Sequence, residues 1–498
     1  MPRLMCCIST LAIAASSPAL AQVSAAEIWS EWQVASAAAG QDMTAEVSET
    51  ADGLVLENFT TRLEQGETIS VGRVERVTLT ETGDGTLSVE LSDPYTLALT
   101  FPEDEDGSLV TMEIVLNHEG LDIMVSGPPE ARSYSYTADA LTVSEGAITN
   151  DSGEAVPQID MEIVARDLAT TYDLIGLPGE DQRFESEGTV GSLAGRFDVI
   201  PPDREEGQLK ASFAMGELSS EAEGSVVALT TIQQTTKGGM PPGFEIDASS
   251  SYSSSRIDIS FDSPTDDFEL DYSNEGGSFG VGFSEQSLSY EIATRESVSR
   301  TSGSEIPFPV EVSSASSELA LTIPLAASET PSDAALRLAV RELSGGDALW
   351  SLIDPTGQVP RDPVTLVIDA TAQVQLMRDL TNPATMEMDA PPGELRSLTV
   401  SELELTFGDT SLTGTADMTF APGQVMPQPV GQVELSLTGG NALLEQLLES
   451  GVITPEQAGM ARGVSGMFSR PGPAPDTLET TIEFQEDGTV TANGVALQ

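Results

Sequence analysis

The residue types that usually perform acid–base or metal chemistry are scarce in this chain, apart from its carboxylates. It contains one histidine, His118, and two cysteines, Cys6 and Cys7. A hydrolase triad needs a histidine base beside its nucleophile, and zinc sites draw on Cys and His. His118 follows an apolar run beside Glu119 and Gly120, so we interpret it as a turn residue. The sequence therefore predicts no catalytic residue, no cofactor and no metal site.

The carboxylates raise the question of calcium. Asp104, Asp106, Gly107 and Glu113 match four positions of an EF-hand loop, but the first position would be Pro102, which offers no ligand. The flanking residues alternate like strands, so we interpret this segment as an acidic hairpin turn. Two carboxylates at a fixed separation could also hydrolyse glycosides. Carbohydrate sites usually add aromatic platforms, however, and only 5% of the residues are aromatic. We therefore predict that the protein is not an enzyme.

The acidity of the chain limits its partners. Eighty Asp and Glu face 21 Lys and Arg, for a formal net charge of −59. Such a chain repels nucleic acid and anionic lipid surfaces. We interpret the acids first as a solvated surface. A docking surface for a basic protein partner or for divalent cations is the alternative.

The first residues have the pattern of a secretory signal peptide. Arg3 precedes an apolar stretch from Leu4 to Ala15, and Ala19-Leu20-Ala21 is a small-x-small cleavage site. We expect residues 1–21 to be removed after Ala21 and the protein to be periplasmic. Both cysteines lie in this leader, so we expect a mature chain without thiols. No later segment has the roughly 20 apolar residues that span a bilayer, so we expect no transmembrane segment.

Alternation with a period of two dominates the rest of the chain. It predicts strands with one buried and one wet face, and Gly-rich turns between them favour antiparallel hairpins. We therefore predict a mainly β protein with one or more large, twisted antiparallel sheets, elongated or groove-like. The segments with this pattern include 87–91, 95–101, 110–116, 121–125, 398–407, 412–420, 433–437 and 482–484.

Two further features concern the strands. The apolar parity changes between Val400 and Leu403, which predicts a bulge near Ser401 and Glu402. The Ser-rich run 249–255 and the Gly-rich run 276–282 are interpreted as polar strands and not as a linker. We divide the mature chain into residues 22–305 and 306–498. The break at 303–309 is weak, with a second candidate at 355–363, and one continuous domain is the alternative.

A few helices have their own signals. Ser24 and Glu27 form a possible capping box for an N-terminal helix that ends at Gly40. Pro331 is a plausible first helical position for a second helix over residues 331–343. A helical hairpin is expected over residues 441–468, with Asn441 capping its first helix and Thr454-Pro455 opening its second. The first two helices, each followed by strands, weakly suggest an internal repeat.

One segment is more specific than the strand patterns. Residues 343–355 read LSGGDALWSLIDP and residues 359–366 read VPRDPVTL. Together with 398–420 and 441–457, they resemble an uncharacterised exported bacterial family, catalogued as domain of unknown function 2125. The Trp-containing start, 29–40, and residues 131–141 with Tyr134 and Tyr136 resemble it too. The resemblance implies no activity and assigns no functional residue.

The residues of this segment have a structural interpretation. We expect Trp350 and Leu352 to pack and Asp354-Pro355 to form a turn. Pro360 and Pro363 lack a backbone donor and should prevent central-strand pairing there.

Two functions remain open. The first is a periplasmic envelope protein, not an enzyme, whose curved sheet cradles a hydrophobic ligand such as a lipid; a distant likeness to β-groove envelope proteins supports it as an analogy of fold. The second is a structural or protein-interaction module whose acidic surface docks a basic partner.

Overall fold

The computed structural model describes most of the chain. The described residues are 23–102, 108–151, 156–177, 181–203, 206–227, 242–354, 357, 359–382, 391–423 and 428–497. The expected signal peptide, Asp104 to Gly107 of the acidic turn, and Pro355 lie outside them.

Strands make up most of the described chain, and all belong to one sheet. Their bounds are β1 Gln41–Glu49, β2 Gly53–Gln65, β3 Thr68–Glu81, β4 Leu87–Leu91, β5 Tyr95–Pro102, β6 Leu109–Glu119, β7 Asp122–Ser126, β8 Ala131–Asn150, β9 Gln158–Ile175, β10 Arg183–Ile200, β11 Gln208–Ser225, β12 Glu245–Tyr252, β13 Ser254–Asp262, β14 Asp267–Asn274, β15 Gly277–Ser284, β16 Ser287–Gly303, β17 Val310–Pro324, β18 Ser332–Gly345, β19 Val364–Leu376, β20 Gly393–Phe407, β21 Thr410–Phe420, β22 Pro429–Thr438, β23 Arg470–Pro471, β24 Thr477–Phe484, β25 Val490–Ala492 and β26 Val495–Ala496.

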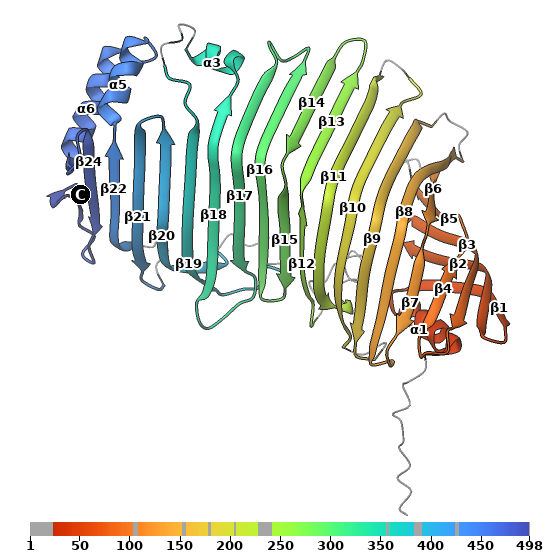
Figure 1. Cartoon of the computed structure of the whole chain (residues 1–498). Coiled ribbons are helices and arrows are strands. Elements are labelled where there is room, and N and C mark those ends of the chain that lie inside the picture. Colours follow the sequence, from red (N-terminus) through yellow and green to blue (C-terminus); the bar gives the residue numbers. More distant parts are fainter. Residues whose placement is uncertain are drawn as a thin grey trace, which may run out of the picture.

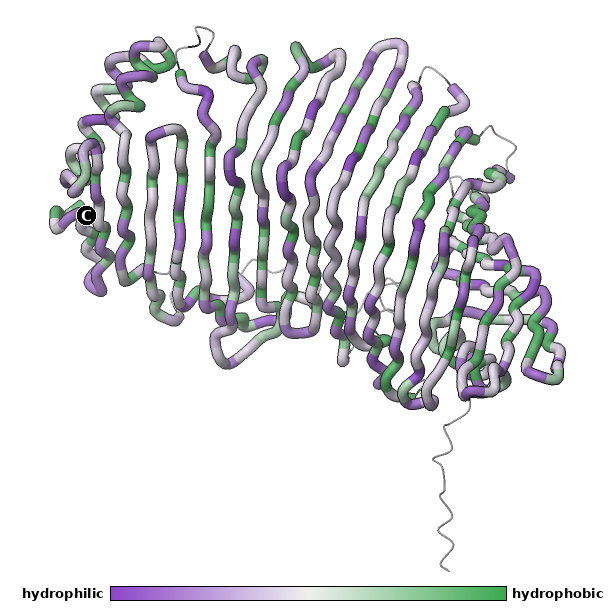
Figure 2. The backbone as a smooth tube through the Cα atoms, viewed as in Figure 1, coloured by the Kyte–Doolittle hydropathy of each residue, from purple (hydrophilic) through white to green (hydrophobic). Residues whose placement is uncertain are grey.

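The sheet is an antiparallel meander. Each long strand pairs with the strands before and after it in the chain, as β10 does with β9 and β11. Figure 1 shows the strands side by side in one row, with the first seven curling around the N-terminal helix. The predicted mainly β, antiparallel fold is confirmed. Hydrophobic and hydrophilic residues alternate along the strands, as Figure 2 shows, and this alternation is what the period-two pattern predicted.

Several short strands are halves of longer ones. β12 and β13 both pair with β11, and β14 and β15 both pair with β16. β6 and β7 likewise both pair with β8. Gly120 and Leu121, between β6 and β7, therefore interrupt one long strand, and the hairpin turn expected at Glu119 and Gly120 is wrong. The polar runs 249–255 and 276–282 do lie in strands, as expected.

A line of irregular backbone crosses the sheet at these interruptions. Asp167 in β9, Glu217 in β11, Glu296 in β16 and Glu342 in β18 have φ between 44° and 53°. The register is kept around Asp167 and Glu217, since Val190 of β10 pairs with both Leu168 and Leu218, whereas the register of β18 on β19 shifts around Glu342. Positive φ is uncommon for residues other than glycine, so its recurrence in several strands marks a shared bend.

The bend has a consequence for the faces of the sheet. Leu366 and Val364 lie on one face of β19, and they pair with Val340 and Leu343 of β18. Directly paired residues share a face, so Val340 and Leu343 face the same way although their parity differs. Glu342 lies between them. At this bend, apolar residues at even positions and apolar residues at odd positions of the strand therefore lie on the same face of the sheet. The bulge predicted near Ser401 is confirmed, because Ala370 pairs with Val400 and Ile368 with Leu403.

A helix covers one end of the sheet. α1, Ala25–Ala38, has Ser24 as its N-cap, and the Ser24 side chain accepts from the Glu27 backbone N–H, which is one of the two bonds of the expected capping box. Ile28 and Trp29 on α1 pack with buried residues of β2, β3, β4, β7 and β8. This is the main buried core of the described chain.

The helix expected at residues 331–343 is wrong, since these residues form most of β18. Ala, Leu and Arg favour a helix locally, but helix propensity is worth only tenths of a kcal/mol per residue. Pairing with β17 and β19 along nearly the whole strand outweighs it. The internal repeat suggested by this helix therefore has no basis. A different short helix, α3 (Asp347–Ile353), follows the strand.

The predicted helical hairpin is present as α5, Gly440–Glu449, and α6, Pro455–Phe468. Thr454 and Gln457 form a complete capping box at α6. Asn441 does not cap α5 as expected. The carboxylate of Asp476, from the far side of the hairpin, accepts from the backbone N–H groups of Asn441 and Ala442 instead.

Strand pairing continues past both candidate domain boundaries. β16 pairs with β17 across residues 304–309, and β18 pairs with β19 across residues 346–363. The division at residue 305 remains a prediction. Among the helices of the described part of the chain, none is long and apolar enough to cross a membrane.

Candidate functional site

One face of the sheet presents a row of uncharged side chains that runs from β8 to β24. We call this face, which carries Tyr134 and Tyr136 and is covered by α1 at one end, the apolar face. Direct pairs connect one residue of each strand along the row. They are Tyr136, Thr170, Gly188, Ser220, Ser250, Phe279, Ile292, Leu319, Leu338, Ile368, Leu403, Gly414, Leu435 and Thr480.

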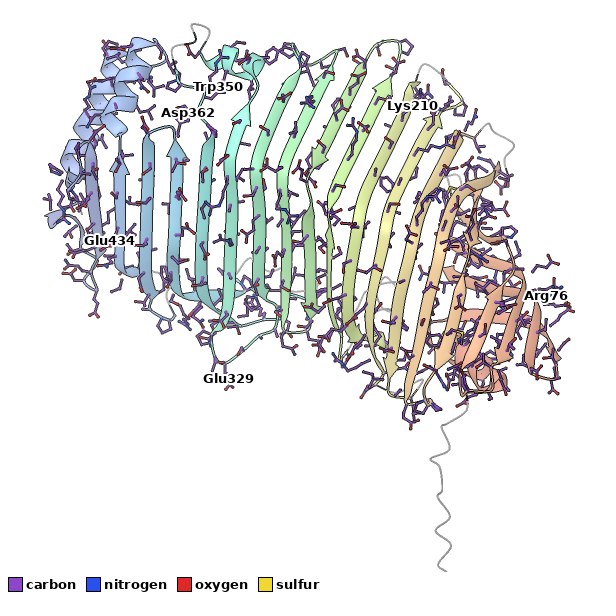
Figure 3. All side chains as sticks on the ribbon, viewed as in Figure 1. Arg76, Lys210, Glu329, Trp350, Asp362 and Glu434 are labelled. Carbon is purple, nitrogen blue, oxygen red and sulfur yellow. The ribbon has the colours of Figure 1, made fainter. Side chains whose placement is uncertain are left out.

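The opposite face is charged, and we call it the charged face. The adjacent row there passes through Glu187, Glu221, Glu291, Arg337 and Asp369. Glu434 on β22, labelled in Figure 3, lies on this face because it is next to Leu435 of the apolar row. The two faces of the sheet thus differ in charge, because one presents an uncharged row and the other a charged row.

Much of the apolar face is open to solvent in the described structure. Phe279 is 40% exposed, Ile292 is 37% exposed and Leu405 is 42% exposed. α1 contacts β1, β2 and β3, whereas the contacts of β9 to β16 are with neighbouring strands.

At the α1 end, the apolar face leads into a cavity. This cavity has a volume of about 430 Å³, within the usual range for small-molecule sites. We call it the α1 cavity. Most of its lining is apolar or aromatic, including Trp32, Met43, Phe59, Tyr134, Tyr136 and Tyr172.

A buried ion pair holds α1 above this cavity. The side chain of Arg132, from β8, is only 2% exposed. Its Nη2 donates to Glu31 Oε1 at 2.6 Å and its Nε donates to Glu31 Oε2 at 3.1 Å. It also donates to the Gly127 carbonyl and lies 3.2 Å from Glu27. Burial opposes the charged form, but the hydrogen bond from Arg132 to Glu31 and the charges of Glu31 and Glu27 raise the pKa of Arg132.

Three tyrosines form the floor beside Arg132. The rings of Tyr134 and Tyr136 stack at 6.3 Å, and Tyr134 lies 6.5 Å from Tyr172. Burial, with the neighbouring Tyr134 and Tyr172, raises the pKa of Tyr136 to about 12, so its phenol is neutral near pH 7. Trp32 Nε1 donates to Tyr134 Oη at 3.3 Å. The floor is therefore aromatic and uncharged.

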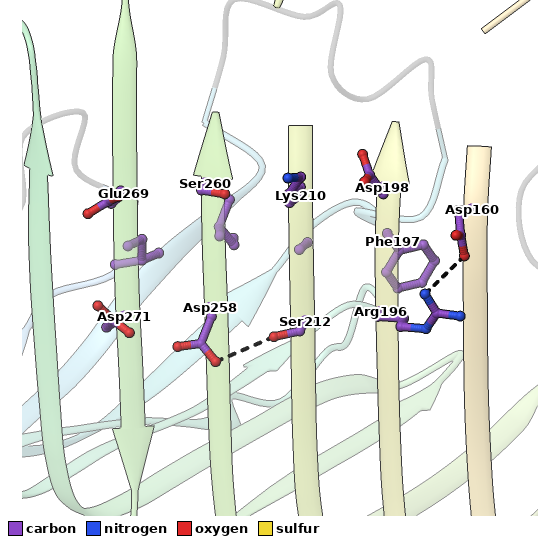
Figure 4. A pocket seen from close by; sticks show the side chains of 13 residues that line it. Asp160, Arg196, Phe197, Asp198, Lys210, Ser212, Asp258, Ser260, Glu269 and Asp271 are labelled. Carbon is purple, nitrogen blue, oxygen red and sulfur yellow. Dashed lines mark hydrogen bonds and ion pairs between the residues drawn. The ribbon is translucent and has the colours of Figure 1, made fainter. Parts of the chain in front are cut away.

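The charged face has a hollow of its own, of about 550 Å³, over β9 to β14. Its labelled side chains come from five neighbouring strands in Figure 4, with Arg196 paired to Asp160 and Ser212 bonded to Asp258. The hydrogen bond from Arg256 lowers the pKa of Asp258, and the neighbouring Asp258 raises the pKa of Asp271. These groups are solvated surface pairs, and surface pairs of this kind contribute little to stability.

His118, the one histidine of the sequence, does not itself line either site. His118 Nε2 contacts the Leu91 carbonyl at 3.2 Å and Asp93 at 3.2 Å, so it links neighbouring strand ends. Among the described residues, no group of three or more His, Cys, Asp or Glu side chains is arranged to hold a metal ion.

The Trp350 segment lies at the edge of the sheet, around α3 (Figure 3). Trp350 stacks on Phe407 at 6.0 Å. Asp354 is buried, and its carboxylate accepts from the Val359 N–H at 2.6 Å. Leu352 does not pack as expected: it is 62% exposed, because residues two apart lie on opposite sides of a helix.

The expectations for the three prolines of this segment are tested to different extents. Pro360 and Pro363 lie in the stretch before β19, which begins at Val364. Pro355 is outside the described residues. A structural role for this segment remains a prediction.

The sequence did not identify Arg132, Glu31, Tyr172 or the α1 cavity. The one available signal was Arg132 itself, because basic residues are few in this chain and Arg132 stands at the start of an alternating segment. Its partners lie about 100 positions away in the chain, and a single sequence does not show that proximity.

No curated protein and no solved structure matches this chain. A family model does match, and it covers residues 278–497, from β15 to the end of the described chain. The N-terminal segments 29–40 and 131–141, where we also expected a likeness, lie outside that match. Over residues 278–497 the expected resemblance is confirmed, because this part of the chain matches the model of the family described as an uncharacterized protein conserved in bacteria, DUF2125.

Proposed function

We propose that this protein is a periplasmic carrier, not an enzyme, that holds a hydrophobic molecule against the apolar face of its sheet. The observation that carries the proposal is the uncharged row from Tyr136 on β8 to Thr480 on β24, beside a charged row on the opposite face. An acyl chain gains free energy on leaving water for such a surface, at about 0.8 kcal/mol per methylene buried.

The charges support this choice over protein docking. The few arginines of the charged face already have carboxylate partners on neighbouring strands. Arg337, for example, lies 3.0 Å from Glu318, 2.7 Å from Asp369 and 3.7 Å from Glu402. Because acids far outnumber bases, this face has a net negative charge that keeps the protein soluble. A basic protein partner for that face is the second candidate.

Two adjacent serines allow a matched test. Ser250 lies on the apolar face and pairs with Phe279, whereas Ser249 lies on the charged face and pairs with Gly280. In S250E, a carboxylate would contact the bound hydrocarbon and lose hydration. We expect S250E to weaken binding of N-phenyl-1-naphthylamine, a neutral apolar dye, by about tenfold or more. S249E should bind it like the wild type.

The fluorescence of the dye measures its affinity for the wild type and for both variants. Equal loss of affinity in both variants would point to a general charge effect and contradict the proposal. So would the absence of dye binding to the wild-type protein.

A further inference from the structure

We propose that the α1 cavity is the closed end of the carrier site and takes the methyl end of a single hydrocarbon chain. This inference rests on the proposed function and adds to it a direction and a ligand class. The tail of the ligand enters beneath α1, and its polar head remains on the open part of the apolar face.

The charged and amide side chains that line the cavity, Glu31, Arg132 and Gln182, already have partners within the protein. Arg132 bonds to Glu31 and to the Gly127 carbonyl, and Gln182 Nε2 donates to the Gly176 carbonyl at 3.1 Å. Trp32 Nε1 is engaged by Tyr134. A ligand head with a charge would compete with these bonds and gain no free counter-charge, since Glu31 and Glu27 balance Arg132. The cavity therefore suits an uncharged, apolar group.

Aromatic rings lead out of the cavity onto the sheet. Tyr136, Tyr134, Tyr172 and Phe184 follow one another across β8, β9 and β10, with centroid separations of 6.3, 6.5 and 5.9 Å. A second row of direct pairs on this face connects Phe184 on β10 with Gly224 on β11 and Ile246 on β12. Phe184 itself is buried, so a linear molecule with one end in the cavity would lie along the uncharged row from Tyr136 through Thr170 to Gly188.

The position of Ala35 allows the cavity to be shortened without disturbing the core. Ala35 is on α1, lines the cavity and is exposed to solvent. The A35F variant should fill part of the cavity and exclude about two methylenes from it. The neighbouring Val34 is 46% exposed and does not line the cavity, so V34F is the matched control.

Displacement of N-phenyl-1-naphthylamine by unbranched primary alcohols of increasing length tests the proposal. These probes are uncharged, so the net charge of the chain does not bias them. In the wild type and V34F, we expect affinity to rise with chain length. In A35F, the longest alcohols should bind about tenfold more weakly than in the wild type, with short alcohols unchanged.

Fluorescence quenching shows which end of the alcohol enters. In the W350F background, Trp29 and Trp32 on α1 are the remaining tryptophans. A long-chain alcohol brominated at its terminal carbon should quench them more strongly than one brominated next to the hydroxyl. The reverse order would overturn the proposed direction.

The outcomes separate this inference from the proposed function. Equal affinities of A35F and wild type for long alcohols would overturn the end-site inference and leave the carrier function standing. Failure of the wild type to bind any alcohol or dye would overturn both.

Discussion

The two ends of the sheet are built differently. Around α1, the strands β2, β3, β4, β7 and β8 enclose a conventional core, in which Ile28, Leu56 and Leu87 are fully buried. From β9 onward, among the described residues, Val367 is the one large side chain that is buried to the same degree. The same alternating pattern thus gives a closed core where a helix covers the sheet and an open apolar face where none does.

The comparison suggests that the closed end provides stability and the open part provides binding. The closed end stabilises the fold by burying apolar surface from several strands. The open part depends on backbone pairing between long neighbouring strands, such as β16, which pairs with β17 from Ser287 to Thr301. Removing a side chain should therefore cost stability at the closed end and binding at the open end.

The largest stability effect is expected for Arg132. R132M leaves Glu31 on α1, whose side chain is only 15% exposed, without its partner, and breaking a pair with a buried member in this way costs about 3–5 kcal/mol. R196M, on the charged face, removes an arginine that is 57% exposed and should cost less than about 1 kcal/mol. Urea denaturation followed by the fluorescence of Trp29 and Trp32 measures both. Equal costs would contradict the proposed difference between the ends.

Leucine truncation sharpens the same contrast. L56A removes a fully buried side chain and should cost about 2–5 kcal/mol. L405A truncates a side chain that is 42% exposed on the apolar face, so it should cost about 1 kcal/mol or less. Thermal unfolding of the two variants gives the comparison. A larger loss for L405A would show that something covers the apolar face.

A third effect concerns the bend between β14 and β15. The Asn274 side chain is buried, donates to Ser255 Oγ at 3.1 Å and accepts from the Gly276 N–H at 3.0 Å. N274A leaves these groups without their partner and should cost about 1–3 kcal/mol. Amide hydrogen exchange at Gly276 should accelerate. Unchanged exchange there would mean that the strands hold the bend without Asn274.

The smallest effect is expected at the α5–α6 hairpin. Burial opposes the ionised form of Asp476, but the hydrogen bonds from Ala442 and Asn441 outweigh it and lower the pKa of Asp476. Its contribution is therefore present above the unfolded pKa of about 4 and is lost as the pH falls through the lower folded value. D476A should cost about 1 kcal/mol at pH 7, as for other helix caps.

The pH dependence provides the control for that variant. The stability difference between wild type and D476A, from urea midpoints, should shrink as the medium is acidified below the folded pKa. A difference that persists unchanged in acid would show that Asp476 does not act through its charge.

The features of this fold that could be predicted from the sequence are those that depend on residues close together in the chain. Alternation in residues 87–125 predicted strands, and the parity change at Ser401 predicted a bulge, because both depend on neighbouring residues. The capping box at Thr454 was predictable for the same reason. Residues 331–343 were assigned wrongly, because pairing with distant strands overrides their helix propensity.

The candidate site depends on contacts between residues far apart in the chain. Tyr134 was visible as part of an alternating segment, but its contacts with Trp32 and Tyr172 follow from how α1 and β9 are placed. The continuity of the apolar face was hidden for a related reason. Residues with positive φ, such as Glu217 and Glu342, lie far apart in the sequence, and only the register of the neighbouring strands shows that they fall on one line across the sheet.

Native mass spectrometry of the full-length protein purified from its own cells tests carriage most directly. We predict a population heavier than the bare chain by the mass of an apolar molecule, which organic extraction removes and S250E reduces relative to S249E. A spectrum that contains only the bare chain, under conditions that retain lipid on a known lipid carrier, would contradict the account.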